Sequence, residues 1–424
     1  MIITLPYGRT SQVDVNVPDE NLYFEVDRRE APALRKPEEA IRREVRASIR
    51  EFSSVFSKAT ERGVLLLVDD ITRPTPHRAI LPPLLDELKK TGVRDEDIRI
   101  LIALGTHRGM SDREIDERYG ETVRERVTIL NHDFRDRENL VDAGKTGSGI
   151  PIIVNKMVFQ HDFVIGIGNI APHNFAGWCG GGKIVLPGVC GEETTGMVHY
   201  VGGKIRPITK LAGNVDNVVR MEIDEVATKA GLDMIVNTIL NEKEEISALA
   251  VGRPLEAFRR GVEQAEGIYC PKIPGYTDIV VFSTYPADID YWQAMKALDF
   301  ACLAVKPGGT IIMVTPCPER ISPTHPSFRE RATCGYNEII ESVERKEIHD
   351  PAVGGALLQH SQILERAMVI CYSSGLTGRD KKDLGFLHAS TLDEAIRMAL
   401  ERQGKDAKIG VLRCGEIAPV VAET

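Results

Sequence analysis

The stretch Val64-Leu-Leu-Leu-Val68-Asp69-Asp70 decides the fold class of this sequence. Its continuous apolar run predicts a buried strand that ends at the two aspartates. The next residues, Ile71-Thr-Arg-Pro-Thr-Pro76, predict a loop stiffened by two prolines, and a helical pattern then runs from His77 to Lys90. Strand, loop and helix in this order form the repeating unit of an α/β fold.

The same order recurs farther along the chain. Apolar residues 98–104 run into Gly105-Thr-His107, and Ser111-Asp-Arg-Glu114 is a capping-box sequence that opens another helix. A third apolar run, residues 163–167, precedes a long glycine-rich loop. Apolar strands alternating with helices predict a largely parallel sheet covered on both faces. Polar groups that follow these strands should meet at the carboxyl edge of the sheet, where such folds bind ligands.

A second α/β domain is predicted after the proline-rich break Ile268-Tyr-Cys-Pro-Lys-Ile-Pro-Gly275. Beyond it, a strand at 278–282, a helix at 291–305 and a strand at 310–314 repeat the α/β pattern. We therefore expect an N-terminal domain over residues 1–270, a C-terminal domain over residues 271–424, and an active site in the cleft between them.

The composition of the chain argues against several classes of function. Its 424 residues carry a net charge of -9 without a long block of Lys or Arg, so a small-molecule partner is expected rather than nucleic acid or a membrane. The start lacks a signal-peptide pattern and no apolar run reaches a membrane-spanning length, which predicts a cytoplasmic protein. The eight cysteines include no C-x-x-C pair, which argues against a disulfide framework and a thiolate zinc site. The composition does not indicate an oligomeric state.

The glycine-rich segment Gly177-Trp-Cys-Gly-Gly-Gly-Lys183 matches part of a phosphate loop, but Ile184 replaces the Ser or Thr that would hold magnesium. ATP hydrolysis is therefore not expected. The glycines still allow a ligand to approach the backbone closely, with the Lys183 amine beside it as a cation or a nucleophile. A solvated surface lysine is the alternative, and the sequence favours neither.

Three histidines are candidates for proton transfer or metal binding. His107 and His173 each follow a predicted strand, so their imidazoles could serve opposite faces of one substrate. The alternative for either one is a turn-capping role. His199 could bind a borderline metal such as nickel, copper or zinc, although a single histidine without a second ligand at helical spacing is more often structural.

Three further polar residues are candidates for substrate binding. Arg73 could hold a carboxylate through two nitrogens, or form an ion pair with Asp69 or Asp70 instead. Gln293 and Lys296 share one face of a predicted helix, where plain solvation is the alternative.

The walls of the pocket that select the substrate side chain are harder to predict. Tyr291, Trp292 and the loop 315–320 are the candidates, because they lie near the predicted substrate-binding helix or follow a predicted strand. No residue clearly marks a second carboxylate in the substrate.

Taken in order, these motifs resemble the nickel-pincer nucleotide-dependent lactate racemase family, which racemises or epimerises 2-hydroxy acids. The resemblance reaches from the N-terminal strands to the second domain. It rests on residues 69–76, Gly105-Thr-His-Arg108, His173, Gly180-Gly-Gly-Lys183, Leu186-Pro-Gly188, His199, Gln293 and Lys296.

The resemblance implies a covalent cofactor. This is a pyridinium-3-thioamide-5-thiocarboxylic acid mononucleotide attached to Lys183, whose two sulfurs and one ring carbon bind nickel. It also implies that His199 is the protein ligand of the metal and that Asp70 helps to bind the nucleotide. Separate biosynthetic enzymes would supply this nickel-pincer nucleotide, and are therefore implied as partners.

The resemblance also implies the catalytic roles. His107 and His173 would be the acid-base pair, and Arg73, Gln293 and Lys296 would hold the substrate. One histidine would take the hydroxyl proton while hydride moves from carbon 2 to the nucleotide, giving a transient 2-keto acid. Return of hydride to the other face would invert the centre. This route avoids a carbanion, because the hydrogen on carbon 2 is a very poor acid.

The substrate implied is lactate or another 2-hydroxy acid, such as malate, 2-hydroxyglutarate, an aromatic lactate or an aldonic acid. Two other interpretations remain open. A nicotinamide-dependent 2-hydroxy acid dehydrogenase would suit the fold, but Gly166-Ile-Gly-Asn-Ile-Ala171 does not complete the dinucleotide-binding motif. A non-catalytic nickel- or nucleotide-binding homologue is the other.

Overall fold

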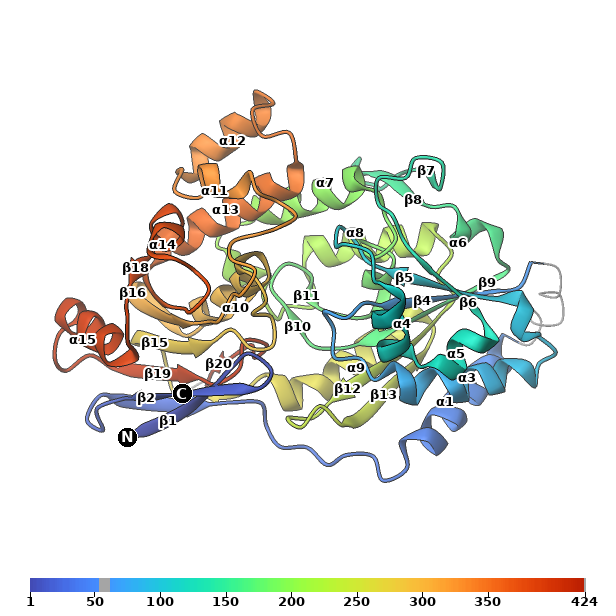
Figure 1. Cartoon of the computed structure of the whole chain (residues 1–424), viewed down its shortest axis with the longest axis horizontal. Coiled ribbons are helices and arrows are strands. Elements are labelled where there is room, and N and C mark those ends of the chain that lie inside the picture. The colour runs from blue at the N-terminus through green and yellow to red at the C-terminus, as the bar shows by residue number, and fades with distance from the viewer. Residues whose placement is uncertain (53–61, 423–424) are drawn as a thin grey trace.

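The chain forms two α/β lobes that lie side by side (Figure 1). The structure is a computed structural model that describes residues 1–52 and 62–422. We call the lobe built around β4 (Val64–Asp69) the N-lobe and the lobe built around β15 (Thr277–Ser283) the C-lobe. The expected α/β class, with largely parallel sheets, is confirmed.

The N-lobe is built on a sheet with the strand order β13-β12-β9-β4-β5-β6. All neighbouring strands run parallel except β12 and β13. Besides β4, the strands are β5 (Ile98–Ala103), β6 (Thr128–Asn131), β9 (Phe163–Asn169), β12 (Met234–Leu240) and β13 (Ile246–Gly252). Every residue of β4 and β9 is buried, which explains their continuous apolar sequence.

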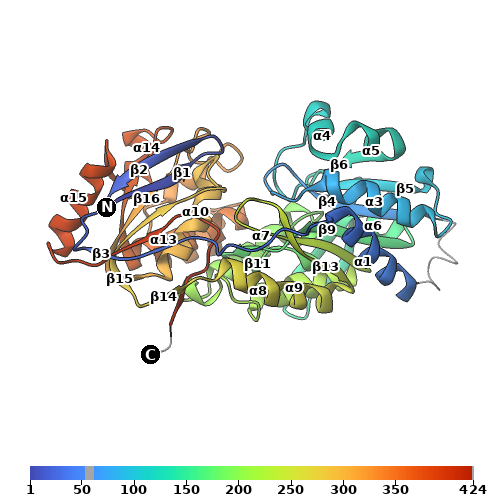
Figure 2. The ribbon, with the colours of Figure 1, turned by 90° about the horizontal axis from the view of Figure 1, so that it is seen from below.

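Helices cover both faces of this sheet (Figure 2). The N-lobe helices are α1 (Pro37–Glu51), α3 (His77–Lys89), α4 (Asp112–Tyr119), α5 (Glu121–Arg126), α6 (Met157–Gln160), α7 (Glu192–Gly203), α8 (Val218–Lys229) and α9 (Pro254–Tyr269). The capping box predicted at Ser111 opens α4: its hydroxyl accepts from the Glu114 amide, and the Glu114 side chain accepts from the Ser111 amide. Smaller elements are β7 (Leu140–Lys145), β8 (Pro151–Asn155), β10 (Pro172–His173), β11 (Gly177–Trp178), η1 (Asp95–Asp97), η2 (Gly181–Ile184) and η3 (Ile208–Lys210).

The C-lobe is built on a parallel sheet with the strand order β18-β17-β16-β15-β19-β3. Its strands are β3 (Leu22–Val26), β15, β16 (Val305–Val314), β17 (Ala367–Tyr372), β18 (Leu387–His388) and β19 (Ile409–Leu412), and a short pair, β14 (Lys272–Ile273) and β20 (Val420–Val421), lies apart from the sheet. Its helices are α10 (Tyr291–Cys302), α11 (Phe328–Arg331), α12 (Tyr336–Glu344), α13 (Pro351–Arg366), α14 (Gly378–Asp383) and α15 (Leu392–Gln403). Across the lobe boundary, α13 packs against α7 (Figure 1).

The N-terminal segment belongs to the C-lobe, which differs from the predicted division at residue 270. The hairpin of β1 (Ile2–Tyr7) and β2 (Ser11–Asn16) packs on the C-lobe sheet, and β3 pairs with β19 at its edge. The chain therefore starts in the C-lobe, crosses to the N-lobe after β3, and returns. Sequence order could not reveal this, because a short strand carries no signal of which edge it will join.

The topology of the N-lobe sheet places a crevice where the sequence predicted one. The central strand β4 has β5 on one side and β9 on the other, so the connections diverge from its carboxyl end. Asp70 follows β4, His107 follows β5 and His173 follows β9. Among the described residues, every helix is too short or too polar to cross a membrane, and all eight cysteines are free.

Candidate active site

One pocket between the lobes brings the predicted site residues together. Its empty volume is about 1080 Å³, part of which is open to solvent. The candidates that line it are Asp70, Arg73, His107, His173, Lys183 and His199 from the N-lobe, and Gln293 and Lys296 from the C-lobe. Their convergence on one cavity is what the strand-end argument predicts for groups at the carboxyl edge of a parallel sheet.

His107 is held by a carboxylate. Its Nδ1 lies 2.7 Å from Asp70 Oδ2 and donates to it, because an ionised carboxylate can only accept. Burial would raise the pKa of Asp70, but the charges of His107 and Arg73 and the hydrogen bonds from His107 and Thr72 outweigh it and lower that pKa. Since Nδ1 carries the proton, Nε2 is the accepting nitrogen, and it accepts from the Gln293 side-chain amide at 3.3 Å.

His173 is held by backbone amides instead. Its Nδ1 accepts from the amides of Phe175 and Ala176, each at 3.2 Å, which places the ring proton of the neutral form on Nε2. Burial, followed by the positive charges of Lys183 and Lys296, holds the pKa of His173 well below its usual value. His173 is therefore neutral at physiological pH.

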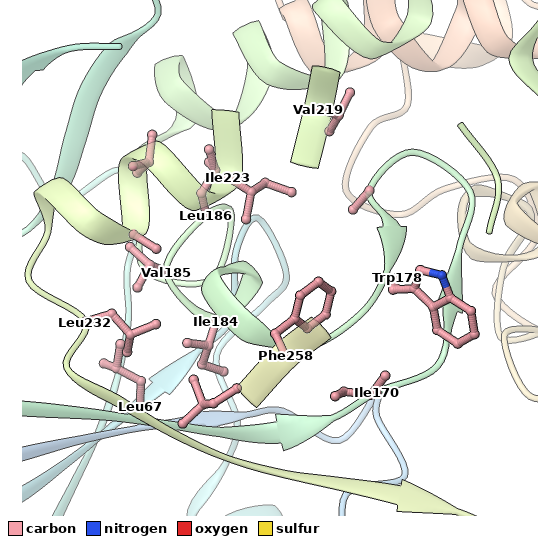
Figure 3. Close-up of a cluster of buried hydrophobic side chains, with 14 of the residues drawn as sticks. Leu67, Ile170, Trp178, Ile184, Val185, Leu186, Val219, Ile223, Leu232 and Phe258 are labelled. Atoms are coloured by element: carbon pink, nitrogen blue, oxygen red, sulfur yellow. The ribbon is translucent and has the colours of Figure 1, made fainter. Parts of the chain in front are cut away.

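Lys183 lies in the short turn η2, which follows the hairpin of β10 and β11. Figure 3 shows how this turn is anchored, with Ile184, Val185 and Leu186 packed among side chains of the N-lobe core. A Cβ on Gly181 would lie 2.8 Å from the Phe258 ring, and its φ of +59° also favours glycine. The glycines thus allow the turn to pack closely.

The Lys183 amine is buried and partly activated. Burial is the largest cause that lowers its pKa, to about 8, and the charges of Arg73 and Arg220 act in the same direction. The neutral amine, the form in which a lysine acts as a nucleophile, is therefore more populated near neutral pH than in an ordinary lysine. The structure disfavours the alternative of a solvated surface lysine, because Lys183 is partly buried and lines the pocket between the lobes.

His199 lies on α7 with one ring nitrogen free. Its Nδ1 donates to the Thr195 carbonyl at 2.7 Å, one turn earlier in the helix, so Nε2 is the unprotonated nitrogen. Burial lowers the pKa of His199 to about 4. A neutral imidazole whose second nitrogen is hydrogen-bonded to a carbonyl is the usual state of a metal-binding histidine.

The substrate-binding candidates form a cationic patch across the lobe boundary. Lys296 donates to the Gln293 side-chain carbonyl, and α10 starts beside them with the Asp290 carboxylate capping the Gln293 amide at 2.8 Å. Burial, then the charge of Arg73, lowers the pKa of Lys296 to about 7. The solvation alternative for Gln293 and Lys296 is wrong, since both line the pocket.

The ion-pair alternative for Arg73 finds no support in the described residues. Asp69 is engaged by His77 at 2.7 Å and Arg118 at 3.1 Å, and Asp70 is engaged by His107. The Arg73 guanidinium donates only to the Thr72 carbonyl, at 3.4 Å. It is therefore available to an anion in the pocket.

The predicted walls are correct only in part. Trp292 lines the pocket, but Tyr291 is fully buried in the C-lobe and its hydroxyl bonds to His360 at 2.6 Å. The loop 315–320 is not among the described lining residues.

Several polar lining residues escaped the sequence analysis. Asn237 is one: its side-chain oxygen accepts from the Gly181 amide at 2.8 Å and so supports the turn that carries Lys183. A polar residue inside the fully buried strand β12 was the signal that could have identified it. Others are Asn169, Asn174, Cys179, Thr195 and Gln359.

Comparison with known proteins identifies relatives for both lobes. Residues 7–207 match the lactate racemase N-terminal domain and residues 274–418 match the lactate racemase C-terminal domain. Lactate racemase of Lactiplantibacillus plantarum is 30% identical, over 84% of this chain and 84% of its own. Lactate racemase of Thermoanaerobacterium thermosaccharolyticum is 27% identical, over 99% of both chains.

Solved structures agree with these matches. The lactate racemase apoprotein from Thermoanaerobacterium thermosaccharolyticum superposes with a TM-score of 0.87 at 26% identity, over the full length of both chains. A Thermotoga maritima protein shares the fold, with a TM-score of 0.73 at 21% identity over 93% of this chain and 100% of its own. The chain belongs to the lactate racemase family.

Proposed function

We propose that this protein racemises or epimerises carbon 2 of a 2-hydroxy acid, with lactate as the first candidate substrate. The observation that carries the proposal is the composition of the pocket at the lobe boundary. It is lined by two histidines with different hydrogen-bond partners, His107 and His173, and by two basic side chains, Arg73 and Lys296. The two relatives named lactate racemase support lactate over other 2-hydroxy acids. Both histidines line this pocket, and His173 Nδ1 also accepts from two backbone amides of its own turn.

We further propose that the pocket holds a nickel-pincer nucleotide on Lys183, with His199 as the protein ligand of the nickel. The residues fit this group in two respects. The Lys183 amine has a lowered pKa, and His199 Nε2 is free. When bound, the nucleotide would accept and return the hydrogen of carbon 2 as hydride.

The protein's own groups would handle the substrate and its proton. Arg73 and Lys296 would bind the carboxylate, so that the hydroxyl group lies within reach of an imidazole. His107 Nε2 would accept the hydroxyl proton, and the Asp70 carboxylate would stabilise the resulting imidazolium. His173 would exchange the proton for the other enantiomer. Because the 2-keto acid is planar, it can turn in place while both cations hold its carboxylate.

The proposal includes the cellular context implied by the family resemblance. The cofactor-making enzymes would be transient partners, and both they and this protein would work in the cytoplasm.

The test has two stages. The protein is co-expressed with enzymes that make the cofactor, and intact mass confirms an adduct that Lys183→Arg lacks. The loaded protein is then given single enantiomers of lactate and other 2-hydroxy acids, and the expected result is conversion of one acid to its racemic mixture. A loaded protein that inverts none of them, or that consumes nicotinamide cofactor, would contradict the proposal.

A further inference from the structure

A buried carboxyl group joins the two lobes beside the pocket. Asp299 lies on α10, one turn after Lys296, and none of its surface is exposed. Its Oδ2 accepts from the Asn174 side-chain amide at 3.0 Å and from the Gln359 side-chain amide. Asn174 follows His173 in the N-lobe, whereas Gln359 belongs to α13 of the C-lobe. One carboxyl oxygen thus connects both lobes.

The hydrogen bonds of this cluster are incomplete. Three buried oxygens lack a hydrogen-bond partner among the described residues: Asp299 Oδ1, Asn174 Oδ1 and Gln359 Oε1. A buried acceptor without a donor destabilises the folded state. All three are acceptors, so the cluster lacks donors. A proton on Asp299 Oδ1 would make that oxygen a donor to one of the two amide oxygens.

The surroundings of Asp299 also disfavour a negative charge. Burial raises its pKa to about 8, and the two amide hydrogen bonds offset this only in part. Its titratable neighbours are the Tyr291 hydroxyl and the Cys302 thiol of the same helix, whose pKa values burial raises. His360, beside Gln359 on α13, is neutral because burial lowers its pKa to about 4. The Lys296 amine is bonded to Gln293 instead.

Asp380, another carboxylate without exposed surface, shows what a charged carboxylate requires. Its side chain is also fully buried, but Arg320 lies 2.8 Å away and Arg329 lies 3.1 Å away. Burial would raise the pKa of Asp380, yet hydrogen bonds from Thr377 and Arg320 outweigh it and lower that pKa. Asp299 has two neutral amides in place of two guanidinium groups.

We propose that Asp299 is a neutral carboxylic acid whose proton bonds to an amide oxygen of Asn174 or Gln359, and that it positions the His173 turn against α10 and α13. Asp299 is thus a positioning residue that fixes the distance between His173 and Lys296. Its catalytic consequence rests on the proposed racemase function, whereas its protonation state and its effect on stability do not.

The first test is infrared difference spectroscopy at pH 6 on the full-length wild-type protein and Asp299→Asn. A protonated carboxyl group absorbs above the amide bands, and we expect one such band to disappear in Asp299→Asn but to remain in the matched control Asp380→Asn. Absence of the band in the wild type, or its persistence in Asp299→Asn, would overturn the proposal. If Asp299→Asn does not fold, Asn174→Ser replaces it, and the band must shift in frequency because its hydrogen bonding has changed.

The second test uses thermal unfolding and needs no activity. The folded state holds the proton up to about pH 8, whereas the unfolded carboxyl releases it near its ordinary value of 3.8. The free energy of unfolding contributed by this group is therefore fully present below pH 3.8 and is lost as the pH rises toward 8. We expect the melting temperature of the wild type relative to Asp299→Asn to fall over this interval. A constant difference would overturn the proposal.

Racemase assays then test the positioning role. Asn cannot ionise, so the ratio of Asp299→Asn activity to wild-type activity should rise as the pH passes about 8. If wild-type protein shows no racemase activity although both physical tests succeed, the proposed function fails while the protonation state stands. A ratio that does not change with pH in an active enzyme would overturn the positioning role.

Discussion

His107 and His173 line the same pocket but differ in what holds them. His107 donates from Nδ1 to the Asp70 carboxylate, which fixes the orientation of its ring. His173 accepts from two backbone amides, and burial, followed by the charges of Lys183, Lys296 and Arg73, holds its pKa well below the usual value. In the free protein the pair is therefore asymmetric.

The difference between the two histidines indicates that the bound substrate must raise the pKa of His173. Burial is the largest cause of the low pKa of His173, and an anionic carboxylate bound by Arg73 and Lys296 would offset two of the positive charges that lower it further. The pKa of His173 would then rise, and the ring could take part in proton exchange. In the proposed mechanism, the Asp70 carboxylate orients His107 before the substrate binds, whereas the carboxylate of the substrate raises the pKa of His173.

Of the changes that test this comparison, removal of either imidazole should lower racemase activity the most. We expect His107→Ala and His173→Ala each to lower kcat/KM for racemisation by roughly 10²- to 10⁴-fold, the usual contribution of general acid-base catalysis. His161→Ala is the matched control, because His161 bonds to the Met157 carbonyl and does not line the pocket. Substantial activity in either pocket variant would remove that histidine from the mechanism.

A smaller effect should follow from neutralising only the partner of His107. Asp70→Asn keeps an acceptor for His107 Nδ1 but removes the charge that stabilises an imidazolium, so kcat should fall by at least about 10-fold. The measurement is kcat for both enantiomers in protein whose adduct on Lys183 is confirmed by mass. An unchanged kcat would mean that the carboxylate only orients the ring.

The smallest expected effect is a shift in the pKa of His173 itself. In protein with ¹⁵N-labelled histidine, Lys296→Met should raise that pKa by about 1 unit or less, because one of the opposing charges is lost. Lactate added to the wild type should shift it in the same direction. The resonance of His77, which pairs with Asp69, serves as the control. A lowered pKa would contradict the electrostatic explanation of the asymmetry.

Much of the fold could be predicted because buried parallel strands have an unambiguous pattern. Residues 64–68, 98–104, 163–167 and 278–282 all lie in or overlap strands, since each is a short apolar run bounded by polar or turn residues. The helix predicted over 291–305 ends at Cys302, and Val305–Gly309 opens β16 instead of ending the helix. The proline and glycines there interrupt the register between β15 and β16, which resembles a helix stop in sequence.

The site could be predicted at the level of residues but not of roles. Each candidate follows a strand or begins a helix, and a parallel sheet gathers such positions at one edge. Which ring nitrogen of His107 or His173 carries the proton depends on a carboxylate 37 positions away in one case and on two local amides in the other. Asp299 gave no signal, because its partners come from two other parts of the chain.

The placement of β3 in the C-lobe sheet has a consequence for the order in which the protein can assemble. On the ribosome, β3 emerges early, but its partner β19 emerges only near the end of synthesis. The N-lobe strands all lie between Val64 and Gly252, so the N-lobe can fold before the remaining C-lobe strands have been synthesised. The face that carries Lys183 is thus built before the lobe that covers it exists, and loss of the first 26 residues would damage the lobe that is completed last.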